Sequence, residues 1–326
     1  MDTVRKNLTL DRQYFGNDIT TSNRFRDTNS AVLFDNVQGS YREIYVNGFY
    51  LGHNDMRLGK KAKTHTQSGQ ETVELICCME GACLQMKSTL ASPVHLIANS
   101  YNVIYSKKSN AETDWFPTNG RVSVLQIHMV PQLFLEYLTL GDKSQNTVRF
   151  EKNIKAGKSC QLCSEGMPLS PYMQFAIDQI INADASKVFK PLYIESKILE
   201  LLALQLKQIV ALEKTPIPTL KPESIKKIAR VKAFMEQNLH KTMTLADLSK
   251  IAGTNDYAIK KGFKRLYGTP VFAYWNTLKM NMAKKLLLQK TVSIGEVSDK
   301  LGYKNQRHFS SAFKKQFGLT PRQFQT

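Results

Sequence analysis

The chain contains 326 residues and carries a formal net charge of +18 at pH 7. This length is typical of two domains, each large enough to bury a hydrophobic core. No apolar run reaches the ~18 residues that a membrane-spanning helix needs. Residues 1–18 lack the apolar core of a secretory signal, and five cysteines are an odd number that does not suit a disulfide framework. We therefore expect a cytoplasmic protein rather than a secreted or membrane-embedded one.

Short strand-like segments occupy residues 41–130. Gly, Asn, Ser and Pro residues separate them at short intervals, which is typical of an antiparallel sheet or barrel. Cys77 and Cys78 lie in the apolar run VELICCM, so we expect them to be buried strand residues. The strand-like segments are residues 42–52, 72–81, 82–88, 101–106 and 121–129.

Helical segments follow Pro131, at residues 131–141, 172–185 and 193–214. The last of them contains more leucine and isoleucine than one core-facing stripe needs. Two interpretations remain open for this helix. Part of it packs on a second subunit, or it is buried on both sides within its own domain.

Residues 215–222, TPIPTLKP, contain three prolines and no helical periodicity, and they predict a stiff linker. Residues 221–326 hold 21 Lys and Arg against 6 Asp and Glu, a balance of +15, whereas residues 1–220 hold 24 against 21, a balance of +3. The positive charge therefore belongs to the C-terminal third, where a polyanionic partner is expected. The predicted domains are residues 1–214 and 223–326, joined by residues 215–222.

Two long helices are predicted after the linker. Residues 224–240 place Ile228, Val231, Met235 and Leu239 on one face. Residues 271–289 form a second helix, about 28 Å long at ~1.5 Å per residue. We expect its apolar stripe to be core rather than a cofactor site. That stripe contains Val271, Trp275, Leu278, Met282 and Leu286.

An internal repeat is the strongest organisational feature of the sequence. The segment NDYAIKKGFKRLYGTP, residues 255–270, returns fifty residues later as NQRHFSSAFKKQFGLTP, residues 305–321. A shorter segment precedes each copy, LADLSKIAG at 245–253 and IGEVSDKLG at 294–302. Each unit predicts a short helix, a turn with glycine and a second capped helix, which is the helix-turn-helix pattern. The helix at 271–289 would then hold two DNA-reading helices about one DNA turn (~34 Å) apart.

An aromatic stripe runs along the second of these helices. Phe309, Phe313 and Phe317 recur at spacings of four and therefore share one helix face. We expect the three rings to be buried and to turn Arg307 and Lys314 outward. The competing idea is that the rings stack on unpaired bases, as in single-strand binders.

Residues 225–326 resemble the AraC/XylS family of bacterial transcription regulators. The resemblance is carried by TLADLSKIAG, FKRLYGTPVFAYW, MAKKLLL and IGEVSDKLGYKNQRHFSSAFKKQFGLTP. The first unit is most similar to the siderophore-responsive branch, such as the pyochelin regulator. The resemblance implies an α+β chain: an N-terminal cupin-like antiparallel β-barrel with helices, then an all-α domain with two helix-turn-helix units. It also implies an N-terminal domain that binds a small-molecule effector and forms a homodimer.

The base-reading positions of the family fall on exposed positions of the two recognition helices. Arg307 is expected to donate two hydrogen bonds to guanine, and Lys260 or Lys261 to donate there as well. Ser311 departs from the arginine often found at its position, which weakens the expected base reading by the second helix. Each lysine could instead be an ordinary solvated surface residue. The expected DNA-binding residues are Tyr257, Lys260, Lys261, Lys264, Arg307, Ser310, Ser311 and Lys314, of which Lys264 and Lys314 suit phosphate contacts.

The N-terminal region offers no metal-site pattern. A cupin metal site would need two histidines one residue apart, then a glutamate and a later histidine. Glu71 and Glu74 follow His65 without completing that pattern, and Cys160-x-x-Cys163 is a single pair without a partner pair. We therefore expect no metal, no cofactor and no catalytic residue. The other histidines of this region, which are scattered along it, are His53, His95 and His128.

The sequence therefore predicts a non-enzymatic, sequence-specific regulator, an activator, that binds double-stranded DNA and contacts RNA polymerase. Its effector would be a small molecule, with an iron-siderophore as the candidate class. Two alternatives remain. One is a regulator that acts through protein partners without an effector, and the other is a DNA-repair enzyme fused to this DNA-binding unit.

Overall fold

The computed structural model describes residues 12–14, 25–34, 37–183, 189–213, 222–267, 269–289, 292–317 and 319–325. The chain divides into two compact units, the first containing residues 1–169 and 176–216 and the second residues 170–175 and 217–326. The linker expected at 215–222 lies outside the described residues except for Pro222, which begins a helix. Among the described residues, no helix is both long and apolar enough to span a membrane.

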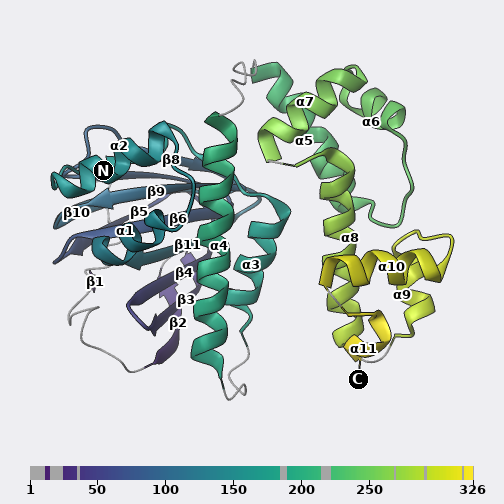
Figure 1. The fold of residues 1–326 in the computed structure, drawn as a ribbon, viewed down its shortest axis with the longest axis horizontal. Helices are drawn as coiled ribbons and strands as arrows, with labels where there is room; N and C mark the ends of the chain where they lie inside the picture. Colours follow the sequence, from purple (N-terminus) through teal and green to yellow (C-terminus); the bar gives the residue numbers. More distant parts are fainter. Residues whose placement is uncertain are drawn as a thin grey trace, which may run out of the picture. The chain divides into compact units, whose positions relative to one another are not determined.

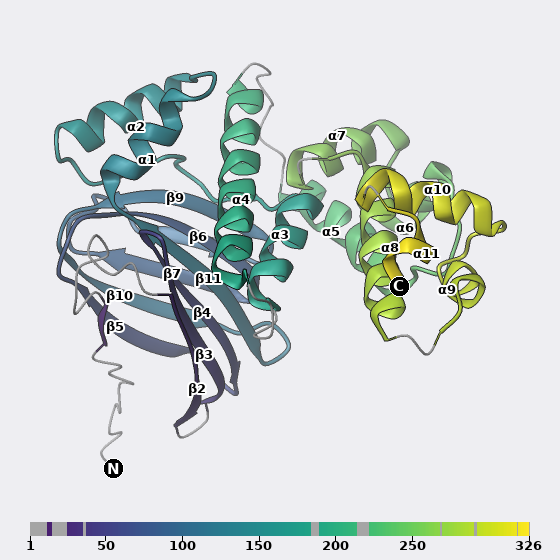
Figure 2. The same ribbon diagram turned by 60° about the horizontal axis from the view of Figure 1, so that its bottom comes forward.

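The first unit is built on two β-sheets (Figures 1 and 2). One sheet has the strand order β1-β5-β10-β7-β8, and the other has the order β12-β9-β6-β11-β4-β3-β2, with β13 also paired to β9. All pairings are antiparallel except that of β1 with β5. The strands are β1 (Arg12–Tyr14), β2 (Arg26–Phe34), β3 (Val37–Val46), β4 (Phe49–Leu58), β5 (Ala62–Ser68), β6 (Thr72–Glu80), β7 (Ala82–Lys87), β8 (Val94–Ile97), β9 (Ser100–Ser106), β10 (Ser109–Phe116), β11 (Arg121–Met129), β12 (Cys160–Gln161) and β13 (Met167–Pro168).

The two sheets share one hydrophobic core. Met56 and Ile76 come from the larger sheet, and Cys83 and Trp115 come from the smaller one. Packing two sheets face to face removes both inner surfaces from water, which is the main stabilising contribution of such a fold. The expected antiparallel β-barrel architecture is therefore confirmed.

The prediction that residues 42–52 form a single strand is wrong. Asn47 and Gly48 both have positive φ, 41° and 82°, and form a two-residue hairpin turn between β3 and β4. Asn-Gly is the pair that favours such a turn because both residues tolerate left-handed backbone. The segment therefore folds back on itself.

Three helices belong to the first unit: α1 (Pro131–Thr139), α2 (Gln145–Lys155) and α4 (Lys190–Glu213). Helix α3 (Pro171–Ile181) is divided, since its residues 171–175 are assigned to the second unit and the rest to the first. The expected helices at 131–141, 172–185 and 193–214 match α1, α3 and α4 as far as the structure describes them; residues 184, 185 and 214 lie outside the described ranges. Helix α2 was missed. One face of α4 is buried, with Ile194, Ile198 and Ile209 almost inaccessible to solvent. The hydroxyl group of Tyr101 on β9 donates to the Gln208 side chain of α4 at 2.9 Å.

The second unit is entirely helical in its described residues. Helix α8 runs between two groups of helices, α5–α7 and α9–α11 (Figure 1). Each group has its own hydrophobic core. The expected all-α domain with two helix-turn-helix units is therefore confirmed. The helices are α5 (Pro222–Gln237), α6 (Leu245–Ala252), α7 (Asp256–Tyr267), α8 (Val271–Leu288), α9 (Ile294–Lys300), α10 (Gln306–Phe317) and α11 (Pro321–Gln325).

The stripe expected on the helix at 271–289 needs correction. Val271 and Trp275 are buried, but Met282 is 40% exposed. The reason is that α8 serves two cores. Its first half contributes residues such as Trp275 to one core, and its second half turns Met280 and Ala283 into the other. A single straight stripe cannot face two cores that lie on different sides of one helix.

Candidate nucleic-acid interface

The first helix-turn-helix unit is α6, its turn and α7. Thr244 and Asp247 form a capping box at the start of α6, and Gly253 ends the helix in left-handed backbone with φ 62°. Asn255 then caps α7, since its Oδ1 accepts the backbone N–H of Ala258 at 2.8 Å. These local bonds fix both helix ends, so that the buried face of α7 can pack on the core.

Helix α7 has one buried and one exposed face. Ile259 and Phe263 are fully buried. Tyr257 is 70% exposed, and the Nζ of Lys261 lies 5.5 Å from the centre of its ring. The remaining expected contact residues of this helix, Lys260 and Lys264, are exposed as well. The structure thus brings all four expected residues of the first unit to the outward face of one helix.

The second helix-turn-helix unit, formed by α9, its turn and α10, is built in the same way. Ser293 and Glu296 form its capping box, as Thr244 and Asp247 do in the first unit. Asn305 accepts the backbone N–H of Arg307 at 2.7 Å. The equivalent local bonds in the two units explain why the sequence repeat produces a structural repeat.

The aromatic stripe of α10 faces inward. Phe309 and Phe313 are fully buried, as expected, and Phe317 is half-buried. Phe313 contacts Phe309 and Phe317, with ring centroids 6.0 Å and 4.6 Å away. Phe309 and Phe313 therefore have no exposed ring face that could stack on bases.

The opposite face of α10 carries the expected contact residues. Arg307, Ser311 and Lys314 are exposed, and Ser310 is half-buried because it directly follows the buried Phe309. Among the expected contact residues of both units, the five cations form no ion pair with any carboxylate in the described part of the chain. Their charge is therefore not neutralised within the described protein and remains available to an anionic partner.

Three further polar residues around α10 were not among the expected ones. Lys304, His308 and Lys315 are all exposed. Lys315 could have been found from the repeat, because the alignment of the two units pairs it with Arg265. For Lys304 and His308 the sequence offers no comparable signal.

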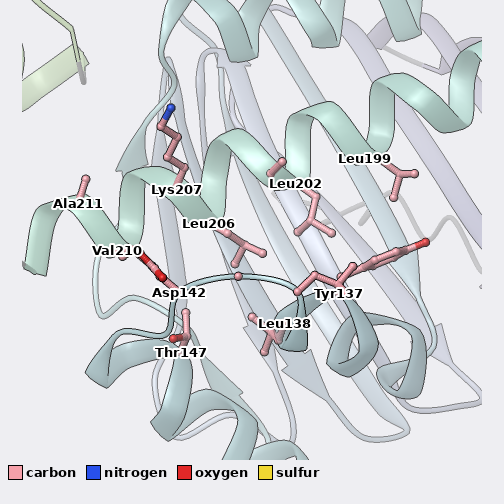
Figure 3. Close-up of a pocket in the computed structure, with 13 residues that line it drawn as sticks. Tyr137, Leu138, Asp142, Thr147, Leu199, Leu202, Leu206, Lys207, Val210 and Ala211 are labelled. Carbon is pink, nitrogen blue, oxygen red and sulfur yellow. The ribbon is translucent and has the colours of Figure 1, made fainter.

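The first unit contains an apolar groove of about 640 Å³ between α4 and the end of α1. Figure 3 shows Leu202 and Leu206 of α4 facing Leu138 across it, while Lys207 points away from these side chains. Leu140, which also lines the groove, is 81% exposed. An exposed apolar surface of this kind marks a binding surface in many proteins.

A polar hollow of about 610 Å³ lies elsewhere in the first unit, over β2, β3 and β4. Asp27 forms ion pairs there with both Arg42 and Lys190, each at 2.6 Å. Burial alone would raise the pKa of Asp27, but its bonds to the two cations lower it overall. One carboxylate thus faces two cations, and a second carboxylate, that of Asp55, also lines the hollow.

Glu74 and His128, which are far apart in the sequence, are cross-strand neighbours inside the barrel. Glu74 is fully buried and pairs with Lys87 at 2.5 Å; burial alone would raise its pKa, but this cation lowers it to about 2. Burial lowers the pKa of His128 to about 4. No group of three or more His, Cys, Asp and Glu side chains could hold a metal ion within the residues the structure covers. The five cysteines are free thiols.

Comparison with known proteins identifies the family. A family model described as the regulatory protein PchR N-terminal domain matches residues 38–220, more than half of the chain. The chain belongs to the PchR branch of the AraC-type transcription regulators. A second model, described as a helix-turn-helix domain, matches residues 248–326. The family resemblance read from the sequence, including its branch, is confirmed, and this PchR-type chain is a transcriptional regulator with an AraC-type DNA-binding domain.

Two curated relatives and one solved structure each match about a third of this PchR-type chain. The transcriptional activator NphR of Rhodococcus sp is 33% identical over 95 residues, which cover 29% of this chain and 28% of that protein. The bifunctional transcriptional activator/DNA repair enzyme AdaA of Bacillus subtilis is 30% identical over 91 residues, covering 28% and 43%. A crystal structure of an AraC-type regulator from Chromobacterium violaceum is 28% identical and covers 32% of this chain and 94% of that one, with a TM-score of 0.30. The chain thus spans less than half the length of these two curated relatives.

Proposed function

We propose that this regulator reads specific duplex DNA through α7 and α10, which enter adjacent segments of the major groove. The observation that carries the proposal is the equivalence of the two helices. Each has a buried aromatic face, and each presents exposed cations without an ion-pair partner among the described residues. An outward, unneutralised positive face on the second helix of a helix-turn-helix is what a major-groove reader requires.

The contacts divide into two kinds. Arg307 suits a bidentate contact with guanine, and Lys260 or Lys261 can donate to a neighbouring base. Lys264 and Lys314 lie one helical turn further on, where phosphate contacts would position the helix without reading sequence. Tyr257, Ser310 and Ser311 complete the proposed base-reading set.

Residues 1–214 would form a homodimer, and α4 supports this proposal. Leucines 192, 199 and 206 recur every seven residues, and each is followed four residues later by Ser196, Ala203 or Val210, which is the spacing of a coiled-coil seam. Leu192 is 62% exposed, and Leu199, Leu206 and Val210 are only partly covered. The seam includes the groove of Figure 3, so the same helix of a second copy is the occupant that fits it best.

An effector would then bind in the polar hollow. Its volume lies within the range of about 300–1,000 Å³ that small-molecule sites occupy. The cations Arg42 and Lys190 favour an anionic, oxygen-rich molecule such as an iron-siderophore complex. The cavity inside the barrel, about 50 Å³, is too small for such a ligand. Effector binding would favour the state of the protein that activates transcription. This activator would act in the cytoplasm and would contact RNA polymerase while it is bound to DNA.

Selection of duplexes from a random pool by the full chain tests the DNA-reading proposal. We expect enrichment of one sequence with two separated informative segments. A pool in which no sequence is enriched would contradict it. Thermal shift of the full chain with ferric siderophores tests the effector proposal. Asn29→Trp should fill the hollow and abolish the shift, whereas Gln38→Trp, on an exposed position outside the hollow, should keep it.

A further inference from the structure

Lys279, in the middle of α8, reaches backbone atoms of both halves of the DNA-binding unit. Its Nζ donates to the carbonyl oxygen of Leu301, at the end of α9, at 2.8 Å. It also donates to the carbonyl oxygen of Lys241, in the connection between α5 and α6, at 3.0 Å. Hydrogen bonds from a charged donor are shorter and stronger than neutral ones. One ammonium group therefore joins a loop of the first helix-turn-helix unit to a helix end of the second.

Aromatic rings hold the ammonium group in place. The Nζ of Lys279 lies 5.1 Å from the ring centre of Trp275 and 5.6 Å from that of Tyr303. Tyr303 is fixed in turn, because its hydroxyl group donates to Asn276 Oδ1 at 2.9 Å. The ring faces favour a cation at this distance. Burial lowers the pKa of Lys279. Hydrogen bonds to the two carbonyl oxygens favour its charged form.

The backbone segments that Lys279 joins also touch each other. Gly302 has φ 73°, and a Cβ on it would lie 1.9 Å from the carbonyl oxygen of His240. Thr242 donates to the carbonyl oxygen of Gly302 at 3.3 Å. Leu239 packs against both hydrophobic cores. The two helix-turn-helix units therefore have a second contact besides the continuous helix α8.

We infer that Lys279 is a positioning residue that fixes the spacing and relative orientation of the two recognition helices. The inference rests on the proposed reading of DNA by α7 and α10. Lys279 itself lies on α8, outside the expected base-reading set. Its effect would arise because two binding elements held at the right separation bind together far more tightly than either alone.

Hydrogen exchange of the full-length chain without DNA tests whether Lys279 joins the two helix-turn-helix units. In Lys279→Met we expect faster amide exchange in residues 239–243 and 300–304, with α7 and α10 unchanged. Lys279→Arg keeps the charge and the donors and should restore slow exchange. Lys226→Met removes the same charge from an exposed position on α5 and should change neither segment. Unchanged exchange in Lys279→Met, or faster exchange throughout the second unit, would overturn the inference.

Binding to the duplex that the wild-type chain selects tests the consequence for DNA. Lys279→Met should lose roughly tenfold in affinity for the complete site and keep its affinity for a duplex with only one of the two segments. One base pair inserted between the segments should weaken the wild type more than it weakens the variant. Equal losses on complete and single segments would overturn the inference. If the wild type selects no duplex, the proposed DNA reading fails, and hydrogen exchange still decides whether Lys279 braces the two units.

Discussion

Phe313 on α10 packs against Phe324 on α11, with ring centroids 5.5 Å apart and ring planes at 64°. This edge-on contact ties the second recognition helix to the last helix of the chain. An aromatic pair in this geometry contributes about 0.5–1.5 kcal/mol beyond the burial of its surface. The face of α10 that holds the fold is therefore distinct from the face that carries Arg307 and Lys314.

Phe313→Ala should destabilise the second helix-turn-helix unit, which contains α9 and α10. Removing a fully buried phenylalanine costs about 3–5 kcal/mol, a large part of the roughly 5–15 kcal/mol that stabilises a domain. We expect a lower unfolding midpoint and loss of DNA binding through unfolding, whereas Leu319→Ala, at an exposed position, should change neither. Thermal unfolding and duplex binding measured on the same samples check this. An unchanged midpoint with binding lost would instead favour stacking of Phe313 on bases.

Arg307→Ala and Lys314→Ala should weaken DNA binding in different ways. Loss of Arg307 should cost about 1–3 kcal/mol and relax specificity at one or two base pairs. Loss of Lys314 should weaken all duplexes about equally and make the salt dependence shallower by about 1. Neither variant should change the unfolding midpoint, since both side chains are exposed. An Arg307→Ala variant that only lost non-specific affinity would show that the assumed register of α10 is wrong.

The affinity for duplex DNA should depend steeply on salt. If the basic second unit neutralises about 6–8 phosphates, the logarithm of the binding constant should fall with that of the salt concentration with a slope of roughly −5 to −7. Fluorescence anisotropy at several salt concentrations, on the full chain and on residues 221–326, measures the slope. Salt-independent binding, or preference for single strands, would contradict the electrostatic account.

Leu206→Glu should break the proposed dimer. A carboxylate buried in the seam without a partner is costly, and each ~1.4 kcal/mol raises the dissociation constant about tenfold. Light scattering over a range of protein concentrations should show a dimer for the wild type and a monomer for the variant. Glu200→Lys is the matched control, because this exposed residue of the same helix does not line the groove. A wild-type protein that is monomeric at all concentrations would contradict the proposed dimer.

The first unit should lose stability in mild acid. Burial holds the pKa of His128 near 4, below its ordinary value of 6.5. The unfolded chain therefore binds more protons between these two pH values, and stability falls as the pH falls through this window. At ~1.36 kcal/mol per pKa unit, His128 should contribute about 2 kcal/mol to the loss between pH 6.5 and 5, and His53, whose pKa burial also lowers to about 4, should contribute a similar amount. Urea unfolding at both pH values should show this loss in the wild type and a smaller one in His128→Gln; equal losses would contradict the assignment.

Much of the second unit could be predicted because its signals are local. The glycine at 253, the capping pairs Thr244–Asp247 and Ser293–Glu296, and the spacing of Phe309 and Phe313 each determine structure within a few residues. The repeat supplies each of these local signals twice. The exposed positions of the contact residues followed from the same periodicity.

The features that were predicted wrongly or missed depend mostly on contacts between residues far apart in the sequence. Met282 is exposed because α8 turns between two cores, which no single periodicity can reveal. Helix α2 was missed because its capping box uses Thr147 rather than the usual Glu or Gln. Glu74 and His128 looked scattered in the sequence, and only the strand register makes them neighbours.

Methylation protection of guanine N7 on the selected duplex tests whether α7 and α10 read the major groove, because N7 lies in that groove. With the full chain bound, we predict two clusters of protected guanines about one helical turn (~10 base pairs) apart on the same side of the duplex. Arg307→Ala should remove protection from the cluster that α10 contacts and leave the other cluster intact. A single cluster, protection that Arg307→Ala does not change, or no protection of N7 at all would contradict the claim that α7 and α10 read adjacent segments of the major groove.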